Sequence, residues 1–229
     1  MKKIAIIPAR GGSKRILKKN SKPFFGKPII AYSIEAAINS GLYDEVMVST
    51  DDQEIADIAV KYGAKVPFMR SEANSSDFAT TVDVLLEVIR WYEQKGAYFE
   101  LATCIYACAP FVNSKLLNES FKFLKDKNAD CVFPSIAYSH PIQRAIKILE
   151  DGRIEQFDSK NPDARTQDMP KAFYDAGMFY TFNVARLLET HSLRTENTFS
   201  IEVDELHAND IDTESDWQMA VIKYKLFLR

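Results

Sequence analysis

The residues best suited to chemistry in this chain form a cluster of cations near its N-terminus. Five cationic side chains lie within ten residues, and they are Arg10, Lys14, Arg15, Lys18 and Lys19. They follow an apolar, β-branched run at residues 4–7 that is typical of a buried strand. Because α/β sheets bind ligands at the carboxyl ends of their strands, cations on a loop at this position predict a site for a polyphosphate.

Two glycines in the same loop support a phosphate site. Gly11 and Gly12 have no side chain, so the backbone and its amide donors can approach a ligand closely. Pro8 is expected to end the hydrogen-bonded pairing of the strand just before them. The segment matches neither the P-loop pattern, in which four residues separate two glycines, nor the dinucleotide pattern Gly-x-Gly-x-x-Gly. The alternative is a solvated basic loop, because runs of charge are usually solvated.

A pair of aspartates near the other end of the chain could supply the metal ion that a polyphosphate needs. Asp210 and Asp212 are two residues apart in a segment expected to be extended, so both carboxylates face one side while Ile211 points into the core. Mg²⁺ takes one or two protein carboxylates together with phosphate oxygens and water. The pair therefore predicts a magnesium site. The alternative is that Asp212 only caps the helix that follows.

Two further polar clusters follow predicted extended segments. Residues 49–52 end a strand with the sequence Ser-Thr-Asp-Asp, and capping of the next helix by Asp51 is the favoured interpretation. Arg70 follows a short extended segment, where its guanidinium could read a base carbonyl or pair with a carboxylate.

A last group of polar residues lies in or beside a proline-containing segment, and its members are Gln143, Arg144, Arg165 and Gln167. Arginine is suited to bidentate recognition of a carboxylate. The alternative is pairing on the surface or between subunits. The chain shows no spacing typical of a Ser/His/Asp triad or of a zinc site, and its three histidines are expected to be structural or solvated.

The elements that must position these residues alternate between strand and helix patterns over the first 135 residues. The spacing predicts strands at residues 4–7, 45–50, 101–106 and 130–136, and helices at residues 28–39, 53–62, 82–95 and 114–127. Further strands are predicted at residues 172–182 and 200–203, and helices at residues 184–190 and 214–228. This alternation predicts an α/β fold with three αβα layers around a mainly parallel sheet.

The alternation stops near residue 139, where an insertion is expected. Residues 139–170 contain three prolines and a short amphipathic hairpin at residues 145–157 that turns at Asp151 and Gly152. We therefore expect residues 1–138 and 172–229 to form the α/β domain and residues 139–171 to form an inserted arm.

Composition narrows the class of protein. The 229 residues are 46% hydrophobic and 27% charged, which is typical of a soluble globular protein with one sizeable α/β domain. A formal net charge of −3 disfavours general nucleic-acid binding, and the absence of a long apolar run disfavours a membrane span. The three cysteines are expected to be reduced, buried thiols in a cytoplasmic protein.

Taken together, these motifs resemble the signature of the CMP-sugar synthetases, which are cytidylyltransferases that activate nonulosonic acids such as sialic acid. The resemblance runs along the whole chain, through Ile-Pro-Ala-Arg-Gly-Gly-Ser-Lys-Arg-Ile at residues 7–16, Lys19-Asn20, Val-Ser-Thr-Asp-Asp at residues 48–52, Val-Pro-Phe-Met-Arg at residues 66–70, Arg-Thr-Gln-Asp at residues 165–168 and Asp-Ile-Asp-Thr-Glu-Ser-Asp-Trp at residues 210–217. Within the family, residues 75–81, 104–106, 140–145 and 174–180 are most similar to the pseudaminic acid enzymes. The chain departs from the family pattern at Leu17, where proline is common, and at Ala107-Cys108, where Pro-Thr is common.

The resemblance implies a fold of the nucleotide-diphospho-sugar transferase type with a small inserted dimerisation arm. It also implies an Mg²⁺-dependent reaction in which the anomeric 2-hydroxyl of a nonulosonic acid attacks the α-phosphate of CTP and pyrophosphate leaves. Pseudaminic acid is the expected nonulosonic acid. The alternatives are a cytidylyltransferase for N-acetylneuraminic, legionaminic or 3-deoxy-manno-octulosonic acid, and a non-catalytic nucleotide-binding domain. The product would serve surface glycans such as those of flagellin.

The resemblance also assigns roles to individual residues. Catalysis is expected from Arg10, Lys14, Lys19 and Asp212, with Mg²⁺ held by Asp210 and Asp212. The nucleotide-binding residues are expected to be Ala9, Arg10, Gly11, Gly12, Ser13, Asn20, Arg70 and Ala79, of which Arg70 and the backbone near Ala79 would read cytosine. The sugar acid is expected to meet Tyr106, Gln143, Arg144, Arg165 and Gln167, partly across the two-fold axis of a homodimer.

Overall fold

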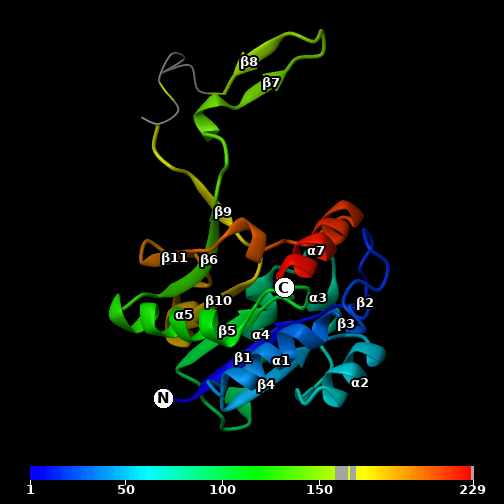
Figure 1. Cartoon of the computed structure of the whole chain (residues 1–229). Coiled ribbons are helices and arrows are strands. Elements are labelled where there is room, and N and C mark those ends of the chain that lie inside the picture. The colour runs from blue at the N-terminus through cyan, green and yellow to red at the C-terminus, as the bar shows by residue number, and fades with distance from the viewer. Residues whose placement is uncertain (158–164, 166–168, 228–229) are drawn as a thin grey trace.

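The centre of the protein is a seven-stranded sheet with helices on both faces (Figure 1). The computed structural model describes residues 1–157, 165 and 169–227. In spatial order the strands are β11 (Thr198–Glu202), β6 (Cys131–Ala137), β10 (Phe179–Asn183), β5 (Leu101–Ile105), β1 (Lys3–Pro8) and β4 (Glu45–Ser49), and β9 (Phe173–Asp175) pairs with β6. Pro8 is the last residue of β1 and lies opposite Ser49, so the predicted end of this strand is confirmed to within one residue.

The sheet is mixed, whereas the alternation of elements predicted a mainly parallel one. β1 runs parallel to β4 and β5, and β11 runs parallel to β6. β10 is antiparallel to both β5 and β6, and β9 is antiparallel to β6. Among the described residues between β6 and β9 there is no α-helix, and parallel neighbours need a long crossover connection, which is usually such a helix.

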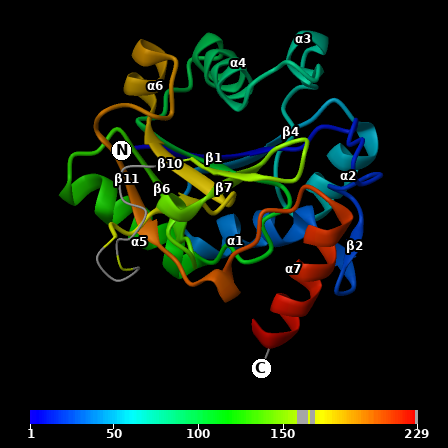
Figure 2. The same ribbon diagram turned by 90° about the horizontal axis from the view of Figure 1, so that it is seen from above.

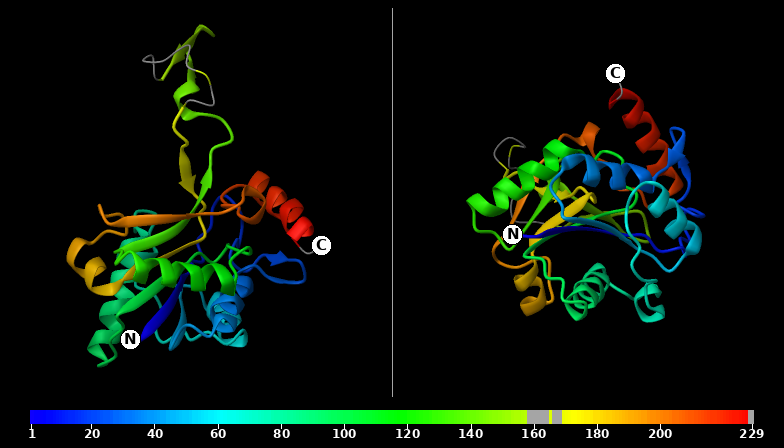
Figure 3. Two further views of the ribbon diagram at one scale, coloured as in Figure 1. Left: turned by 60° about the vertical axis from the view of Figure 1, so that its left-hand side comes forward. Right: turned by 90° about the horizontal axis from the view of Figure 1, so that it is seen from below.

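The helices form two layers, which confirms the predicted αβα architecture (Figure 2). The helices are α1 (Ile30–Ser40), α2 (Gln53–Lys61), α3 (Glu72–Ser75), α4 (Thr81–Gln94), α5 (Ser114–Asp126), α6 (Val184–Thr190) and α7 (Glu214–Phe227). α4 and α6 cover one face of the sheet, and α1, α5 and α7 lie on the other (Figure 2, Figure 3). Within the described ranges, no helix is long and apolar enough to cross a lipid bilayer.

The two core layers follow from the alternation of side chains along β1. Ile4 and Ile6 are fully buried in the cluster beneath α4 and α6, and Ala5 and Ile7 are fully buried in the cluster on the opposite face. The cysteines Cys104, Cys108 and Cys131 are buried and free of disulfide bonds, as predicted.

One predicted helix start and one predicted helix cap are wrong. Pro28 belongs to β3 (Lys27–Pro28), which pairs with β2 (Pro23–Phe24), and α1 begins only after Ile29. Asp52, not Asp51, caps α2, since its side chain accepts a hydrogen bond from the backbone N–H of Ile55.

The predicted hairpin of the insertion is confirmed. β7 (Ile146–Ile148) pairs antiparallel with β8 (Ile154–Gln156), and Gly152 in the turn has φ +84°. A short 3₁₀ turn (Ile142–Arg144) precedes it. The hairpin stands away from the sheet and its helices (Figure 1, Figure 3), so its apolar side chains have no core of their own; Ile148, for example, is 76% exposed.

Candidate active site

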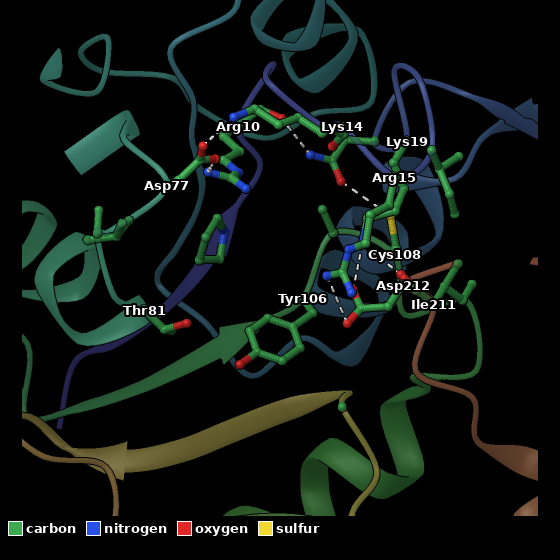
Figure 4. Close-up of a pocket in the computed structure, with 18 of the residues that line it drawn as sticks. Arg10, Lys14, Arg15, Lys19, Asp77, Thr81, Tyr106, Cys108, Ile211 and Asp212 are labelled. Atoms are coloured by element: carbon green, nitrogen blue, oxygen red, sulfur yellow. Dashed lines mark hydrogen bonds and ion pairs between the residues drawn. The ribbon is translucent and has the colours of Figure 1, made fainter. Parts of the chain in front are cut away.

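A pocket of about 410 Å³ opens where β1 and β5 end (Figure 4). Its walls come from segments far apart in the sequence: the basic loop after β1, the loop before α4, the residues after β5 and the segment before α7. Ten of the predicted site residues line it, namely Arg10, Ser13, Lys14, Lys19, Asn20, Arg70, Ala79, Tyr106, Asp210 and Asp212.

On one side of the pocket, two cations of the basic loop bind a single carboxylate. Arg10 donates a hydrogen bond from Nη1 to Asp77 Oδ1 at 2.9 Å, and Lys14 Nζ pairs with Asp77 Oδ2 (Figure 4). The hydrogen bonds from Lys14 and Arg10 hold the pKa of Asp77 below its usual range. Arg10 and Lys14 therefore already bind an anionic group of the protein itself.

On the other side, two more cations meet the predicted metal pair. Lys19 Nζ donates to the carbonyl oxygen of Ile211 at 2.6 Å and lies 3.3 Å from Asp212 Oδ1. Arg15 Nη2 lies 3.0 Å from Asp212 Oδ2 (Figure 4). The basic loop and the aspartate pair, nearly 200 residues apart, are thus in direct contact.

Asp210, the other member of the pair, is fixed by close packing against the turn that contains Gly177. Asp210 and Asp212 both line the pocket, and Ile211 between them is buried, as predicted. Gly177 packs against Asp210 so closely that an added Cβ would lie 2.6 Å from Asp210 Cγ. Partial burial and the charge of Asp212 raise the pKa of Asp210.

This donor set fits a magnesium ion. Two carboxylates with a mutually repulsive charge favour a cation between them, and their oxygens are the hard ligands that Mg²⁺ prefers. Among the described residues, no group of three or more histidine, cysteine or acidic side chains could hold a metal by itself. An ion at this pair would therefore complete its coordination with water and with oxygens of a ligand.

Two hydrogen bonds fix the basic loop from behind. Asn20 donates from Nδ2 to the carbonyl oxygen of Arg10 at 2.9 Å, and its Oδ1 accepts from the thiol of Cys108 at 3.2 Å. Burial raises the pKa of Cys108 to about 12, so this thiol stays protonated near neutral pH and is no nucleophile.

Gly11 in the basic loop lacks room for a side chain, because an added Cβ would lie 2.6 Å from Asp52 Oδ2. Its amide donates to Asp51 Oδ1 at 2.9 Å.

Arg70 is buried at the back of the pocket, and only 7% of it is exposed. Its Nε donates to Ser49 Oγ at 2.9 Å, and its Nη2 donates to the carbonyl oxygen of Ser49. Burial lowers the pKa of the guanidinium, although Asp51 opposes this. These bonds to Ser49 engage only part of its five N–H donors and leave a rigid guanidinium facing the pocket.

Two side chains outside the charged walls shape the rest of the pocket. Thr81 lies across the pocket from Asp212, and the ring of Tyr106 lies between them (Figure 4). Tyr106 packs edge-on against Tyr180, with ring centroids 5.9 Å apart. The hydroxyl group of Tyr180 donates a hydrogen bond to Asp175. Asp175 also accepts from the amide of Gly177 at 2.9 Å, so one carboxylate supports both Tyr106 and the turn beside Asp210.

Several predicted site residues do not reach this pocket. Ala9 is fully buried, and neither it nor Gly11 nor Gly12 lines the wall. Gln143 and Arg144 lie in the 3₁₀ turn of the arm, and Arg165 is exposed. Within the part of the chain that the structure describes, no arm residue lines the pocket. Gln167 lies outside the described residues.

Sequence reasoning missed Asp77 and left Arg15 undecided, although both line the pocket. Asp77 lies in a polar stretch, residues 75–81, whose resemblance to the pseudaminic acid enzymes assigned no role to it, and its partners are more than 60 residues away in the sequence. The fifth cation, Lys18, pairs with Glu54 outside the pocket.

Comparison with known proteins adds four findings. A family model described as cytidylyltransferase matches residues 4–225. A pseudaminic acid cytidylyltransferase of Campylobacter jejuni is 39% identical over 226 residues, covering 99% of this chain and 97% of that protein. A CMP-N,N'-diacetyllegionaminic acid synthase of Legionella pneumophila is 29% identical over 230 residues, covering 96% and 94%. In fold, the chain matches a CMP:2-keto-3-deoxy-manno-octonic acid synthetase complexed with CTP, with a TM-score of 0.70 at 18% identity and 99% coverage of both chains.

The packing of Gly177 against Asp210 predicts a specific cost for a methyl group. Gly177 has φ +63° and no space, whereas Gly152 in the arm has φ +84° and nothing within 4 Å of an added Cβ. We expect Gly152→Ala to lower the free energy of unfolding by about 1 kcal/mol from backbone strain alone. Gly177→Ala should cost about 2–4 kcal/mol, because the methyl group must also displace Asp210.

Urea denaturation of the two variants and the parent protein measures both effects. Equal losses of stability in the two variants would show that the contact between Gly177 and Asp210 does not constrain the site.

Proposed function

The chain belongs to the cytidylyltransferase family and is a nucleotidyltransferase, and from this premise we propose that it transfers CMP from CTP to the anomeric 2-hydroxyl of pseudaminic acid. Pyrophosphate is the second product. The observation that carries the proposal is the contact between the basic loop and the aspartate pair in a single pocket. Cations for a triphosphate and carboxylates for its metal ion are thereby close enough to act on one ligand.

The cations account for triphosphate binding and for the departure of pyrophosphate. Arg10, Lys14 and Lys19 all line the pocket, and each engages a carboxylate or carbonyl oxygen that a phosphate oxygen would replace. Since attack at the α-phosphorus transfers charge to the leaving pyrophosphate, donors held at that position stabilise the transition state more than the ground state. Positioning and charge neutralisation therefore suffice for catalysis, without a covalent intermediate.

The aspartate pair would hold Mg²⁺. Asp210 and Asp212 supply one carboxylate each, which leaves the remaining coordination positions to phosphate oxygens and water. Bound there, Mg²⁺ supplies charge neutralisation and Lewis acidity at the reacting phosphate. Within the protein, Lys19 and Arg15 each pair with one oxygen of Asp212 and so orient its carboxylate.

The base and the sugar would occupy the remaining walls. The buried guanidinium of Arg70 and the backbone near Ala79 both line the pocket and would read cytosine. Ser13 and Asn20 would lie beside the ribose and the phosphates, with Asn20 also holding the carbonyl of Arg10. Tyr106 and Thr81 would face the sugar.

Pseudaminic acid is the preferred substrate because the chain is more similar to the pseudaminic acid enzyme than to the legionaminic acid enzyme. The pseudaminic acid enzyme is 39% identical to this chain, and the legionaminic acid enzyme is 29% identical. Two further points stay predictions. One is that the protein is cytoplasmic, and the other is that its product serves the glycosylation of a surface polymer such as flagellin.

We further propose that the arm at residues 139–171 joins two copies of the chain. Ile146, Ile148 and Ile154 lie on one face of the hairpin, all are exposed, and burial against a second copy would remove this face from water. The pocket of one chain takes none of its lining from the described arm residues. Arg144 and its neighbours would therefore serve the carboxylate of the sugar bound to the other copy, provided that the arms cross.

The function is tested by measuring pyrophosphate release from CTP with a panel of sugar acids. We expect release with pseudaminic acid at a kcat/KM at least about tenfold above that with N-acetylneuraminic, legionaminic or 3-deoxy-manno-octulosonic acid. A higher kcat/KM with another acid would contradict the substrate, and no release with any acid would contradict the activity itself.

The dimer is tested by two double variants of the hairpin. Ile148→Lys with Ile154→Glu places an opposite-charge pair on the apolar face, and we expect a monomer by sedimentation that still binds CTP but has lost most sugar turnover. Lys147→Glu with Glu155→Lys reverses the ion pair on the other face and is the matched control. Sedimentation of the first variant as a dimer, or of the parent protein as a monomer, would contradict the proposed interface.

A further inference from the structure

The carboxylate of Asp77 occupies the cations that the triphosphate needs. Asp77 Oδ1 accepts a hydrogen bond from Arg10, and Asp77 Oδ2 pairs with Lys14. Each oxygen of the carboxylate thus has its own cationic donor, which is how two oxygens of a phosphate group would be held. Arg10 Nη1 also donates to the carbonyl oxygen of Ser76 at 3.3 Å, so the guanidinium is turned toward this loop.

The loop that carries Asp77 has few other attachments. Its two ends are anchored, because Ser71 caps α3 and Thr80 forms a capping box with Asp83 at the start of α4. Within residues 76–79, Ala79 N donates a long hydrogen bond to Ser76 O at 3.4 Å, Ser76 Oγ donates to the carbonyl oxygen of Ala73 at 3.0 Å, and Phe78 is 94% exposed. The ion pairs of Asp77 are therefore the main contacts that hold residues 76–79 against the basic loop.

Asp77 and a triphosphate cannot both use these donors without a penalty. The carboxylate is ionised, since Lys14 and Arg10 hold its pKa below the usual range. A triphosphate placed on Arg10 and Lys14 would bring its own negative charge close to this carboxylate, and like charges at short distance repel. The carboxylate must give up the two cations when the ligand binds.

We propose that Asp77 is a positioning residue that competes with phosphate for Arg10 and Lys14. In the absence of nucleotide it holds both side chains across the pocket, and CTP displaces it. After CMP transfer, its return to the same cations opposes the binding of pyrophosphate and promotes product release. This inference rests on the proposed function, because it takes the pocket to be the triphosphate site.

Direct binding of pyrophosphate to Asp77→Asn separates this role from a structural one. The variant keeps the shape of the side chain but loses its charge, and a merely structural role would weaken binding or leave it unchanged. We expect calorimetry to show tighter pyrophosphate binding than in the parent protein, by about three- to tenfold, since two exposed ion pairs no longer compete. Inhibition of turnover by pyrophosphate should become stronger by a similar factor, and kcat should fall more than the KM for CTP.

The matched control is Glu54→Gln, which removes the same unit of charge beside Lys18, outside the pocket. It should leave pyrophosphate affinity within about twofold of the parent protein, because exposed charges at a distance are screened. Asp77→Glu keeps the competing charge and should bind pyrophosphate as the parent protein does.

Three results would overturn the proposal: equal or weaker pyrophosphate binding by Asp77→Asn, an equal gain in Glu54→Gln, or an equal gain in Asp77→Glu. The measurement needs no sugar acid, so an error in the proposed substrate would not affect it. Failure of the parent protein to bind either CTP or pyrophosphate would instead count against the proposed function of the pocket.

Discussion

The neutralisation of like charges in one small pocket is the constraint on which the rest of the structure depends. Four cations of one loop, Arg10, Lys14, Arg15 and Lys19, would repel one another if they faced a ligand-free cavity alone. The protein balances them with two acids from distant segments, Asp77 on one side and Asp212 on the other. The same balance prepares the site for a ligand, because a triphosphate can replace the acids as partner of the cations and a metal ion can replace the cations as partner of Asp212.

The fold brings these distant segments together in one pocket. β1 carries the basic loop, and the turn after β9 fixes the position of Asp210 through Gly177. Asp175 ties that turn to Tyr180 and so to Tyr106. Because β9 is also the strand through which the chain returns from the arm, it supports both the aspartate pair and the base of the arm. A contact made by the arm would therefore act close to the site.

Local patterns in the sequence predicted much of this site, and long-range contacts account for what they did not predict. The apolar run followed by glycines and cations, and the alternating Asp-Ile-Asp, each carry their information within a few residues. The position of β10 between β5 and β6 depends on pairing between strands that are distant in the sequence. Asp77 was missed for the same reason, since its role is defined by Arg10 and Lys14. The choice of Asp52 over Asp51 as helix cap depends on backbone angles, which composition does not reveal.

The central claim is that the cations and the aspartate pair form one site for CTP and a metal ion. Calorimetric titration of CTP, with and without Mg²⁺, into the parent protein and Asp212→Asn tests it most directly. We expect Mg²⁺ to tighten CTP binding to the parent protein by about tenfold or more and to have little effect on the variant. Without Mg²⁺ the variant should bind CTP at least as tightly, because Lys19 and Arg15 lose their competing partner. Equal tightening by Mg²⁺ in both proteins would contradict the account.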